Sequence, residues 1–334
     1  MALPRWSEPI TATRRSWLVT GAAGFIGSHL VSQLLRFDQD VVGLDNFATG
    51  YRRNLDLVRF EVGDEHWERF AFVEGDVREF DTCIETMRGV DFVLHQAALG
   101  SVPRSMVRPL DTHTVNVDGT LNVFLAALET GVRKVVYASS SSVYGDDPEL
   151  PKVEERTGRP LSPYAASKQI SELYANTLSR THGLPAVGLR YFNVVGTRQD
   201  PEGPYAAVVP RWLDAMRSGD RPVIYGDGET SRDFCPIANV IQANLLAAIA
   251  GDHTNGTVFN VALGETTTLN QLFVSLRESL VEIGVECADI EPVYEDFRPG
   301  DIRHSLADIS KAERDFGYEP PVSLAEGLRA TVQG

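Results

Sequence analysis

Cysteine is scarce in this chain of 334 residues, and its three cysteines form no recognisable pattern. Cys83, Cys235 and Cys287 lie far apart and follow neither a metal-site nor a disulfide spacing. We therefore expect no disulfide framework and no metal site. Free cysteines of this kind are typical of a reducing compartment, so we expect a cytoplasmic protein.

Long apolar runs are also missing. The longest runs have the length of a strand, so we expect no transmembrane span. The first fifteen residues lack the continuous apolar segment of a secretory signal. We interpret residues 1–15 as an N-terminal extension that precedes the first strand.

Positive charge is outnumbered by negative charge. Lysine and arginine total 31 against 46 acidic residues, which gives a formal net charge of -15. Nucleic-acid binding needs a basic face, so we expect no nucleic-acid partner. An anionic small ligand stays possible, because a local cluster of charge can bind it. Lysine is especially rare, with only Lys134, Lys152, Lys168 and Lys311.

Strand-like apolar runs alternate with helical segments in the first half of the chain. We predict strands at 17–20, 40–45, 70–73, 91–95, 134–138 and 186–190, and helices over about 27–35, 111–130 and 164–181. This alternation indicates an α/β fold with a Rossmann-type doubly wound parallel sheet. The pattern becomes turn-rich after residue 196. We therefore predict a dinucleotide-binding domain over 16–195 and a smaller C-terminal α/β substrate lobe over 196–334.

A glycine-rich turn, Gly21-x-x-Gly24-x-x-Gly27, lies between the first predicted strand and helix. Glycines there permit a tight turn and a close approach of the backbone to a pyrophosphate, which the helix N-terminus attracts. Asp45 ends the second strand, where an acid binds a ribose 2′-hydroxyl and repels a 2′-phosphate. We therefore predict NAD rather than NADP, with Asp76 close to the adenine.

Tyr164 and Lys168 are four residues apart, which places them on one face of the predicted helix. A free tyrosine has a pKa of about 10, and a nearby cation lowers it. Ser140 follows the fifth strand and is expected at the same edge of the sheet. We predict that Ser140 hydrogen-bonds a substrate hydroxyl, that Tyr164 removes its proton, and that Lys168 supports the phenolate and the nicotinamide ribose.

These motifs together resemble the extended short-chain dehydrogenase/reductase family. The resemblance rests on the glycine turn, Asp45-Asn46, His95-Gln-Ala-Ala98, Ser140, Tyr164-x-x-x-Lys168 and Arg190-Tyr-Phe-Asn193, and it covers residues 16 to about 318. Within the family the chain is most similar to nucleotide-sugar epimerases that act on UDP-N-acetylglucosamine and UDP-N-acetylgalactosamine. The segments 44–50, 95–105 and 303–308 carry that closer similarity.

The resemblance implies a set of binding residues. The residues expected to bind NAD are Gly21, Gly24, Phe25, Ile26, Gly27, Asp45, Asn46, Asp76, Val77, Gln96, Ala97, Ala98, Tyr164, Lys168, Tyr191 and Val194. The residues expected to bind the UDP-sugar are Gly100, Ser101, Ser141, Ser142, Asn193, Gln199, Ala207, Val208, Tyr225, Arg232, Arg298, Asp301 and Ser305. Arg232 and Arg298 are expected to hold the diphosphate, because guanidinium groups suit bidentate phosphate contacts.

The family also implies a catalytic cycle. The sugar C4 hydroxyl is oxidised to a ketone, the keto sugar turns over, and the hydride returns to its other face, so NAD stays bound and is regenerated. Related sugar 4,6-dehydratases carry Asp-Glu directly after the residue that corresponds to Ser140. This chain has Ser141 and Ser142 there, which favours epimerisation. Hexose-specific relatives carry a bulky aromatic residue at the position of Ser305, so the serine favours N-acetylated sugars.

Other interpretations stay open. The chain is also compatible with a 4-epimerase of UDP-glucose and UDP-galactose or of UDP-uronic acids, and with a nucleotide-sugar dehydratase or decarboxylase. A non-catalytic NAD-binding sensor of the same fold is another alternative, although such sensors typically lose the tyrosine or the lysine. The resemblance further implies a homodimer that joins through a four-helix bundle built from the 111–130 and 164–181 helices.

Two residues depart from the family pattern. Pro236 replaces an aromatic or aliphatic residue and removes a backbone donor, and Asn239 replaces an acid. Both lie close in sequence to Arg232, so local pairing near the predicted diphosphate site is an open question.

Overall fold

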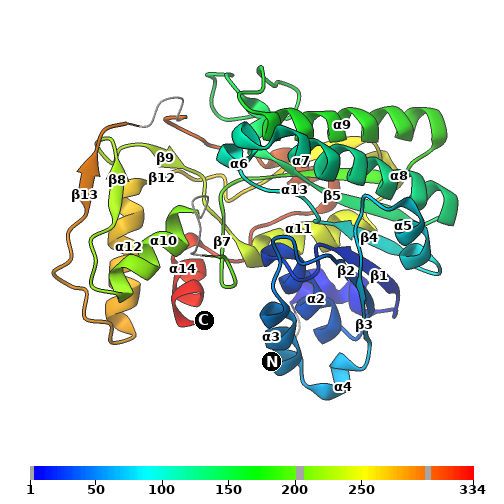
Figure 1. Ribbon diagram of the computed structural model, residues 1–334, viewed down its shortest axis with the longest axis horizontal. Helices are drawn as coiled ribbons and strands as arrows, with labels where there is room; N and C mark the ends of the chain where they lie inside the picture. Colours follow the sequence, from blue (N-terminus) through cyan, green and yellow to red (C-terminus); the bar gives the residue numbers. More distant parts are fainter. Residues whose placement is uncertain (1–3, 201–206, 298–301) are drawn as a thin grey trace.

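A parallel sheet of seven strands forms the centre of the protein in a computed structural model that describes residues 4–200, 207–297 and 302–334 (Figure 1). The strand order is β11-β6-β5-β4-β1-β2-β3, and every neighbouring pair is parallel. The strands are β1 (Ser16–Thr20), β2 (Asp40–Asp45), β3 (Phe70–Glu74), β4 (Phe92–His95), β5 (Lys134–Ser140), β6 (Ala186–Tyr191) and β11 (Thr257–Val261). The order reverses between β1 and β4, which is where ligands of this fold bind.

Helices cover both faces of this sheet, as Figure 1 shows. One face is covered by α2 (Phe25–Arg36) and α11 (Ile237–Ile249), and the other by α5 (Phe80–Met87), α8 (Gly119–Thr130) and α9 (Pro163–His182). The inner strands β1, β4 and β6 are largely apolar because both of their faces are buried, whereas the edge strand β3 is only partly buried. Leu18 and Val19 of β1 illustrate this, since they point into different core clusters.

The predicted Rossmann-type sheet is confirmed, and all six expected strands are present. The seventh strand, β11, was not predicted. It comes from the part of the chain assigned to the substrate lobe, and α11 from that part also packs on the sheet. The proposed division at residue 195 therefore separates two parts of the sequence that are not separate in the structure. The chain leaves the sheet after β6 and returns to it with α11 and β11.

The helix predicted over 111–130 is interrupted. It consists of α7 (Pro109–His113), a π-helical segment η2 (Thr114–Asp118) and then α8. Asn116 in the π-helical segment is buried and donates to the Ser167 hydroxyl at 3.0 Å. Its side-chain Oδ1 accepts from the backbone N–H of Leu99 at 2.8 Å. The π-helical turn thus fixes the loop after β4, in keeping with the frequent occurrence of such turns at functional sites.

The predicted N-terminal extension is folded against the sheet domain. It contains η1 (Arg5–Ser7) and α1 (Glu8–Thr11), and α1 contacts α11. Ile10 is fully buried, and the ring of Trp6 meets Phe37 edge-on at 5.8 Å.

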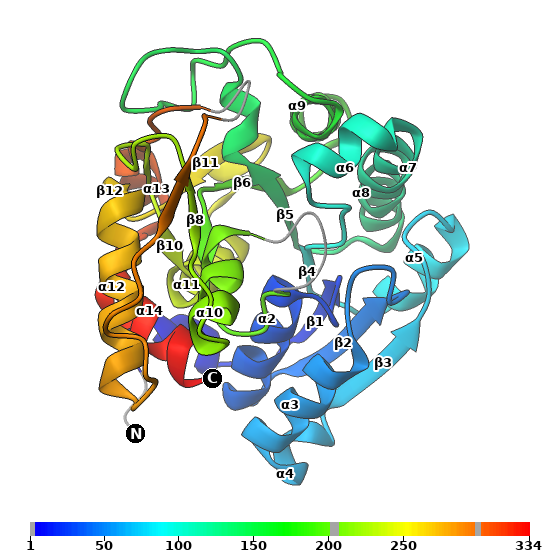
Figure 2. The same cartoon turned by 60° about the vertical axis from the view of Figure 1, so that its left-hand side comes forward.

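A smaller lobe lies beside the carboxyl ends of the strands (Figure 2). Its core is formed by α10 (Val208–Arg217), α12 (Leu269–Glu282) and α14 (Leu324–Gln333), and β8 (Val223–Tyr225) pairs in parallel with β13 (Val293–Glu295). Short pairs connect it to the sheet domain: β7 (Val194–Val195) with β10 (Cys235–Pro236), and β9 (Ser231–Arg232) with β12 (Thr267–Thr268). Within the described ranges, no helix combines the length and apolarity needed to cross a membrane.

The remaining short elements connect these parts. They are α3 (Arg52–Val62), α4 (Asp64–Trp67), α6 (Val102–Val107), η3 (Ser141–Tyr144), η4 (Asp252–Thr254) and α13 (Ser310–Phe316).

Candidate active site

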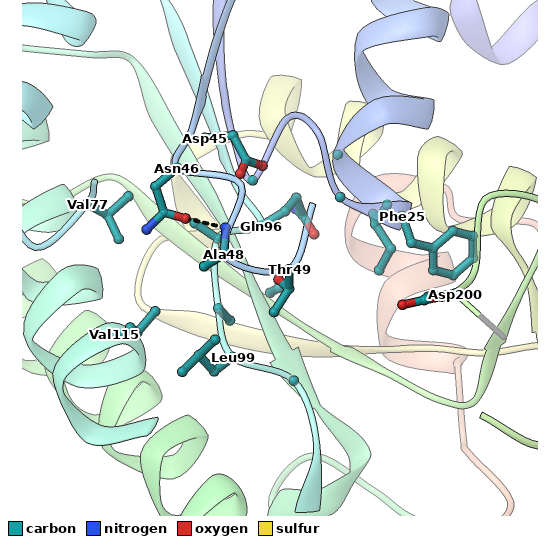
Figure 3. A pocket seen from close by; sticks show the side chains of 18 of the residues that line it. Phe25, Asp45, Asn46, Ala48, Thr49, Val77, Gln96, Leu99, Val115 and Asp200 are labelled. Carbon is teal, nitrogen blue, oxygen red and sulfur yellow. Dashed lines mark hydrogen bonds between the residues drawn. The ribbon is translucent and has the colours of Figure 1, made fainter. Parts of the chain in front are cut away.

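A cavity of about 520 Å³ lies at the carboxyl ends of the sheet strands (Figure 3). The glycine turn between β1 and α2 forms one wall. Gly21 has a φ of +69°, and a Cβ there would lie 2.9 Å from the backbone nitrogen of Ala97. A Cβ on Gly27 would lie only 2.0 Å from the carbonyl oxygen of Gly21. These glycines are therefore required for close backbone packing, and they leave the N-terminus of α2 open to an anionic ligand.

Asp45 connects the end of β2 to the glycine turn. Its carboxylate accepts from the backbone N–H of Ala23 at 2.9 Å and from that of Phe47 at 2.8 Å. Burial raises the pKa of Asp45, and these backbone donors oppose that shift. The carboxylate lines the cavity, as does the adjacent Asn46 (Figure 3).

Asn46 and Asp76 form the next part of the same wall. The Asn46 amide donates to Asp76 at 2.7 Å and accepts from the backbone N–H of Ala48 at 2.9 Å (Figure 3). A hydrogen bond from Arg78 lowers the pKa of Asp76 to about 2. This end of the cavity is therefore anionic and rich in hydrogen-bond acceptors, which suits a ribose with free hydroxyls and disfavours a phosphorylated one.

Ser140, Tyr164 and Lys168 lie close together, and Tyr164 and Lys168 line the cavity. Ser140 ends β5, and Tyr164 lies in the first turn of α9, which Ser162 caps by accepting from the Ala165 N–H at 3.1 Å. A hydrogen bond joins the Ser140 hydroxyl to the Tyr164 phenol. The Lys168 ammonium donates to the carbonyl oxygen of Ala138 at 2.8 Å and lies 6.0 Å from the centre of the Tyr164 ring.

The protonation of this group differs from the prediction. Burial raises the pKa of Tyr164, and only the hydrogen bond from Ser140 opposes the shift. Burial lowers the pKa of Lys168 to about 8, while the nearby Glu172 raises it. The expectation that Lys168 lowers the pKa of the phenol is therefore wrong for these contacts. The reason is that desolvation of the phenol is the largest effect on its pKa, while the Lys168 ammonium lies 6.0 Å from the ring centre.

The predicted cofactor residues gather around one cavity. All of them except Val194 line it. Val194 lies in β7 and pairs with Cys235 of β10. The cavity satisfies the requirements of NAD: a glycine cradle, a helix N-terminus, and the buried Gln199 side-chain oxygen, which has no hydrogen-bond partner among the described residues. No three His, Cys, Asp or Glu residues of the described ranges come together to hold a metal ion.

The predicted substrate residues are more dispersed. Gly100, Gln199 and Ala207 line the main cavity. Val208 and Tyr225 line a second cavity of about 290 Å³ between α10 and β8. Arg298 and Asp301 lie outside the described residues.

Four predicted substrate residues make structural hydrogen bonds, and two more directly follow Ser140. The Ser101 hydroxyl caps α6 by accepting from the Arg104 N–H, and the Asn193 amide donates to the Asp233 carbonyl oxygen. Arg232 donates to two backbone carbonyl oxygens. The Ser305 N–H donates to the Ser231 carbonyl oxygen. Ser141 and Ser142 form the start of η3. The Ser142 hydroxyl is buried and has no partner in the described part of the chain, so it is a candidate for a polar ligand.

Asp233 connects segments of the chain that carry predicted substrate residues. Its buried carboxylate accepts three backbone N–H groups, from Leu263 at 2.9 Å, Gly264 at 3.1 Å and Ala307 at 3.2 Å. Burial raises the pKa of Asp233 to about 6, against the effect of these donors. One carboxylate thus fixes three separate segments beside Arg232 and Ser305.

Sequence reasoning missed several residues of the site. Asp233 and Asn116 escaped it because their partners lie 30 or more and 17 or more residues away in the chain, respectively. Leu99, Arg104 and Val115 also line the cavity. Leu99 and Arg104 lie in the segment 95–105 that carries the closer family similarity, so they could have been predicted from that similarity.

The two departures from the family pattern are structural. Pro236 lies in β10, where the neighbouring Cys235 supplies the backbone donor to Asn193 at 3.1 Å. Asn239 is fully buried, and its amide donates to and accepts from the backbone of Val322 at 2.8 and 3.0 Å. An acid could accept but not donate there, so asparagine suits this contact.

Comparisons with known proteins agree with this geometry. Residues 17–262 match the model of the NAD dependent epimerase/dehydratase family. A UDP-glucose 4-epimerase of Mycolicibacterium smegmatis is 38% identical over 95% of this chain and 97% of its own length. A UDP-glucuronate 4-epimerase of Thermodesulfobacterium geofontis is 32% identical over 95% of this chain and 94% of its own length.

A solved structure extends the similarity to three dimensions. A UDP-N-acetylglucosamine 4-epimerase from Methanobrevibacter ruminantium M1, in complex with UDP-N-acetylmuramic acid, superimposes with a TM-score of 0.88. It is 40% identical and covers 96% of this chain and 98% of its own. The glycine turn, the acid after β2, Tyr164 and Lys168 line one cavity, and Ser140 lies beside Tyr164. The chain belongs to the NAD dependent epimerase/dehydratase family, within the extended short-chain dehydrogenases/reductases.

Proposed function

We propose that the protein interconverts UDP-N-acetylglucosamine and UDP-N-acetylgalactosamine by NAD-dependent epimerisation at C4. The observation that carries the proposal is the hydrogen-bonded Ser140–Tyr164 pair beside Lys168, followed by Ser141 and Ser142 instead of an acidic pair. This group can move one proton to and from an alcohol. It offers no acid and base at 141–142 for eliminating water, which argues against a dehydratase.

The chain's own residues have defined tasks in this reaction. Gly21, Gly27 and Asp45 would hold NAD, which supplies a hydride acceptor and donor when bound. Ser140 hydrogen-bonds the C4 oxygen, and Tyr164 takes its proton. Lys168 stabilises the resulting phenolate, whose formation burial disfavours. After the keto sugar has turned over, Tyr164 returns the proton to the C4 oxygen on the opposite face.

The preference for an N-acetyl group rests on Ser305. Its backbone is pinned to Ser231 by a hydrogen bond of 3.1 Å, next to the segment that Asp233 fixes, and its side chain is small. The similar structure from M. ruminantium is described as an N-acetylglucosamine enzyme, which supports this preference. The relatives named for UDP-glucose and UDP-glucuronate keep two alternative substrates open, plain hexoses and uronic acids.

A homodimer through α8 and α9 is part of the proposal. These helices pack against each other, and apolar side chains remain exposed on them: Leu125 is 39%, Leu173 is 67% and Tyr174 is 39% exposed. Pairing two helices from each subunit would cover these side chains. Light scattering of the wild type and of Leu173→Asp tests this, with a dimer expected only for the wild type. A cytoplasmic location stays a prediction.

Incubation of the purified protein with UDP-N-acetylglucosamine, without added NAD, tests the activity. Chromatographic separation of the C4 epimers should show UDP-N-acetylgalactosamine. Absence of the epimer even with NAD supplied would overturn the proposal. Faster turnover of UDP-glucose or UDP-glucuronate would overturn only the N-acetyl preference.

A further inference from the structure

A buried ion pair lies directly behind Lys168. Glu172, one helical turn after Lys168 on α9, accepts two hydrogen bonds from the Arg190 guanidinium of β6, at 2.9 and 2.8 Å. The Arg190 side chain is 4% exposed and the Glu172 side chain 12%. Nothing in the proposed proton transfer uses this pair directly, so its position needs a separate explanation.

The pair belongs to a hydrogen-bond network that connects α9 with β5, β6, η3 and β11. Ser139 of β5 donates to Glu172, and Arg190 also donates to the Tyr144 hydroxyl at 3.0 Å. Tyr144 in turn donates to Asn260 of β11 at 2.6 Å. The network therefore fixes α9 against β5 and β6, and with it the position of the Glu172 carboxylate relative to the neighbouring ammonium group.

Stability alone is a weak reason for such a pair. The cost of desolvating two buried charges usually equals or exceeds their attraction, and apolar residues of similar volume often replace such pairs without loss. A buried carboxylate one turn from a buried ammonium has a different effect, because it favours the charged form of that ammonium.

The other titratable groups around Lys168 offer no such support. Tyr164 lies on the same helix, and burial keeps its phenol protonated. His95 of β4 is neutral, since burial lowers its pKa to about 3. Tyr137 of β5 stays protonated in its buried position. Arg190 is itself a cation, so Glu172 is the one acid of the described surroundings with a resolved effect on Lys168.

We infer that Glu172 is a positioning residue that keeps Lys168 protonated, and that Arg190 holds the Glu172 carboxylate in place for this purpose. Burial lowers the pKa of Lys168, and Glu172 raises it, so that the pKa is about 8 with both effects present. Loss of the carboxylate would therefore lower the pKa further and leave more of the lysine uncharged near neutral pH. A neutral lysine cannot stabilise the Tyr164 phenolate.

The scarcity of lysine makes a direct test practical. With only four lysines, ¹³Cε-lysine labelling gives four NMR signals, and Lys168→Met identifies the signal of Lys168 by its loss. We expect the pKa of Lys168 to fall in Glu172→Gln. The matched control is Glu155→Gln, which removes an acid 3.3 Å from Lys311 and should leave the titration of Lys168 unchanged. An unchanged Lys168 pKa in Glu172→Gln would overturn the inference.

Folding of the single variant is a separate risk, because it leaves Arg190 buried without its partner. The double variant Glu172→Gln/Arg190→Gln removes both charges and is measured in the same way. Because loss of the Arg190 cation itself raises the pKa of Lys168, the reference for the double variant is Arg190→Gln, and a Lys168 pKa no lower in the double variant than in Arg190→Gln would equally overturn the role of Glu172.

The kinetic consequence rests on the proposed function. At pH 8 we expect the kcat of Glu172→Gln to fall about fivefold, since a fall of about one unit from a pKa of about 8 lowers the charged fraction of Lys168 from about one half to about one tenth. The ratio of variant to wild-type kcat should rise as the pH is lowered, because Lys168 becomes protonated again. A ratio independent of pH would indicate a structural role and overturn the inference. A wild type without epimerase activity would refute the proposed function and leave the NMR result intact.

Discussion

The two ends of the active site are built in different ways. The cofactor end is assembled from short sequence segments that directly follow β1, β2 and β4, and backbone groups of these segments make most of its contacts. The predicted substrate end draws on residues near 193, 231 and 305, which side chains such as Asp233 connect to one another and to the segment at 263. The first end depends on local geometry, and the second on a few long-range polar contacts. Each end should therefore fail in its own way when a single residue is changed.

Loss of the Tyr164 hydroxyl should have the largest effect and should spare both ends. We expect Tyr164→Phe to reduce kcat by about 10³-fold, in the range of general acid–base catalysis, because no other group at Ser140 can take the proton. The epimer assay measures the loss, and absorbance at 260 nm checks that NAD is retained. Activity above one tenth of the wild type would show that Tyr164 is not the base.

A methyl group at Gly27 should break the cofactor end alone. The added Cβ would lie 2.0 Å from the Gly21 carbonyl oxygen, so the turn must shift at a cost of about 1–3 kcal/mol. We expect Gly27→Ala to lose bound NAD and to recover little activity when NAD is added. Gly284→Ala is the control, since Gly284 also has a positive φ, +86°, but no atom lies near its Cβ position. Equal NAD content in both variants would contradict the role of the turn.

Removal of the Asp233 charge should weaken the substrate end alone. Asp233→Asn presents an amide N–H to three backbone donors, which costs about 1–3 kcal/mol. We therefore expect KM for the UDP-sugar to rise about tenfold, while the NAD content stays unchanged. The pKa of Asp233 is raised to about 6, and the ionised form accepts all three donors. KM of the wild type should therefore rise below pH 6, and KM of the variant should lack this step. A matching step in the variant would assign it to another group.

A change at Ser305 should have the smallest effect and should alter only which sugar fits. We expect Ser305→Tyr to lower kcat/KM for the N-acetylated sugar about tenfold relative to UDP-glucose, as a change of pocket volume allows. Competition between the two substrates in one reaction measures the ratio. Ser305→Ala is the control, because it keeps the small volume and should keep the preference.

The same contrast explains what could be predicted from the sequence. The six strands followed from apolar runs, and the glycine turn with Asp45 followed from patterns of neighbouring residues, whereas most of the expected cofactor residues came from the family resemblance. The strand β11 was missed because it begins directly after Gly256 in a turn-rich region, and only its pairing with β6 makes it a sheet strand. The π-helical turn at 114–118 and the contacts of Asp233 depend on partners far away in sequence.

The protonation of Tyr164 was mispredicted for a physical reason. The four-residue spacing correctly placed Lys168 beside the phenol, but spacing carries no information about desolvation. Desolvation raises the pKa of Tyr164 and lowers that of Lys168, so the pair needs further charged groups to act as a base and its support. Residue patterns identify the members of a site more readily than their charge.

The return of the chain to the sheet through β11 makes the two lobes one folding unit. Cutting the chain after residue 195 would strip β6 of its outer neighbour and expose a long apolar edge with unpaired N–H and C=O groups, and the loss of α11 would uncover one face of the sheet. Such an edge promotes aggregation. The NAD-binding part is therefore not a portable module, and gene fusions or domain exchanges in this protein have to keep residues 16–261 together.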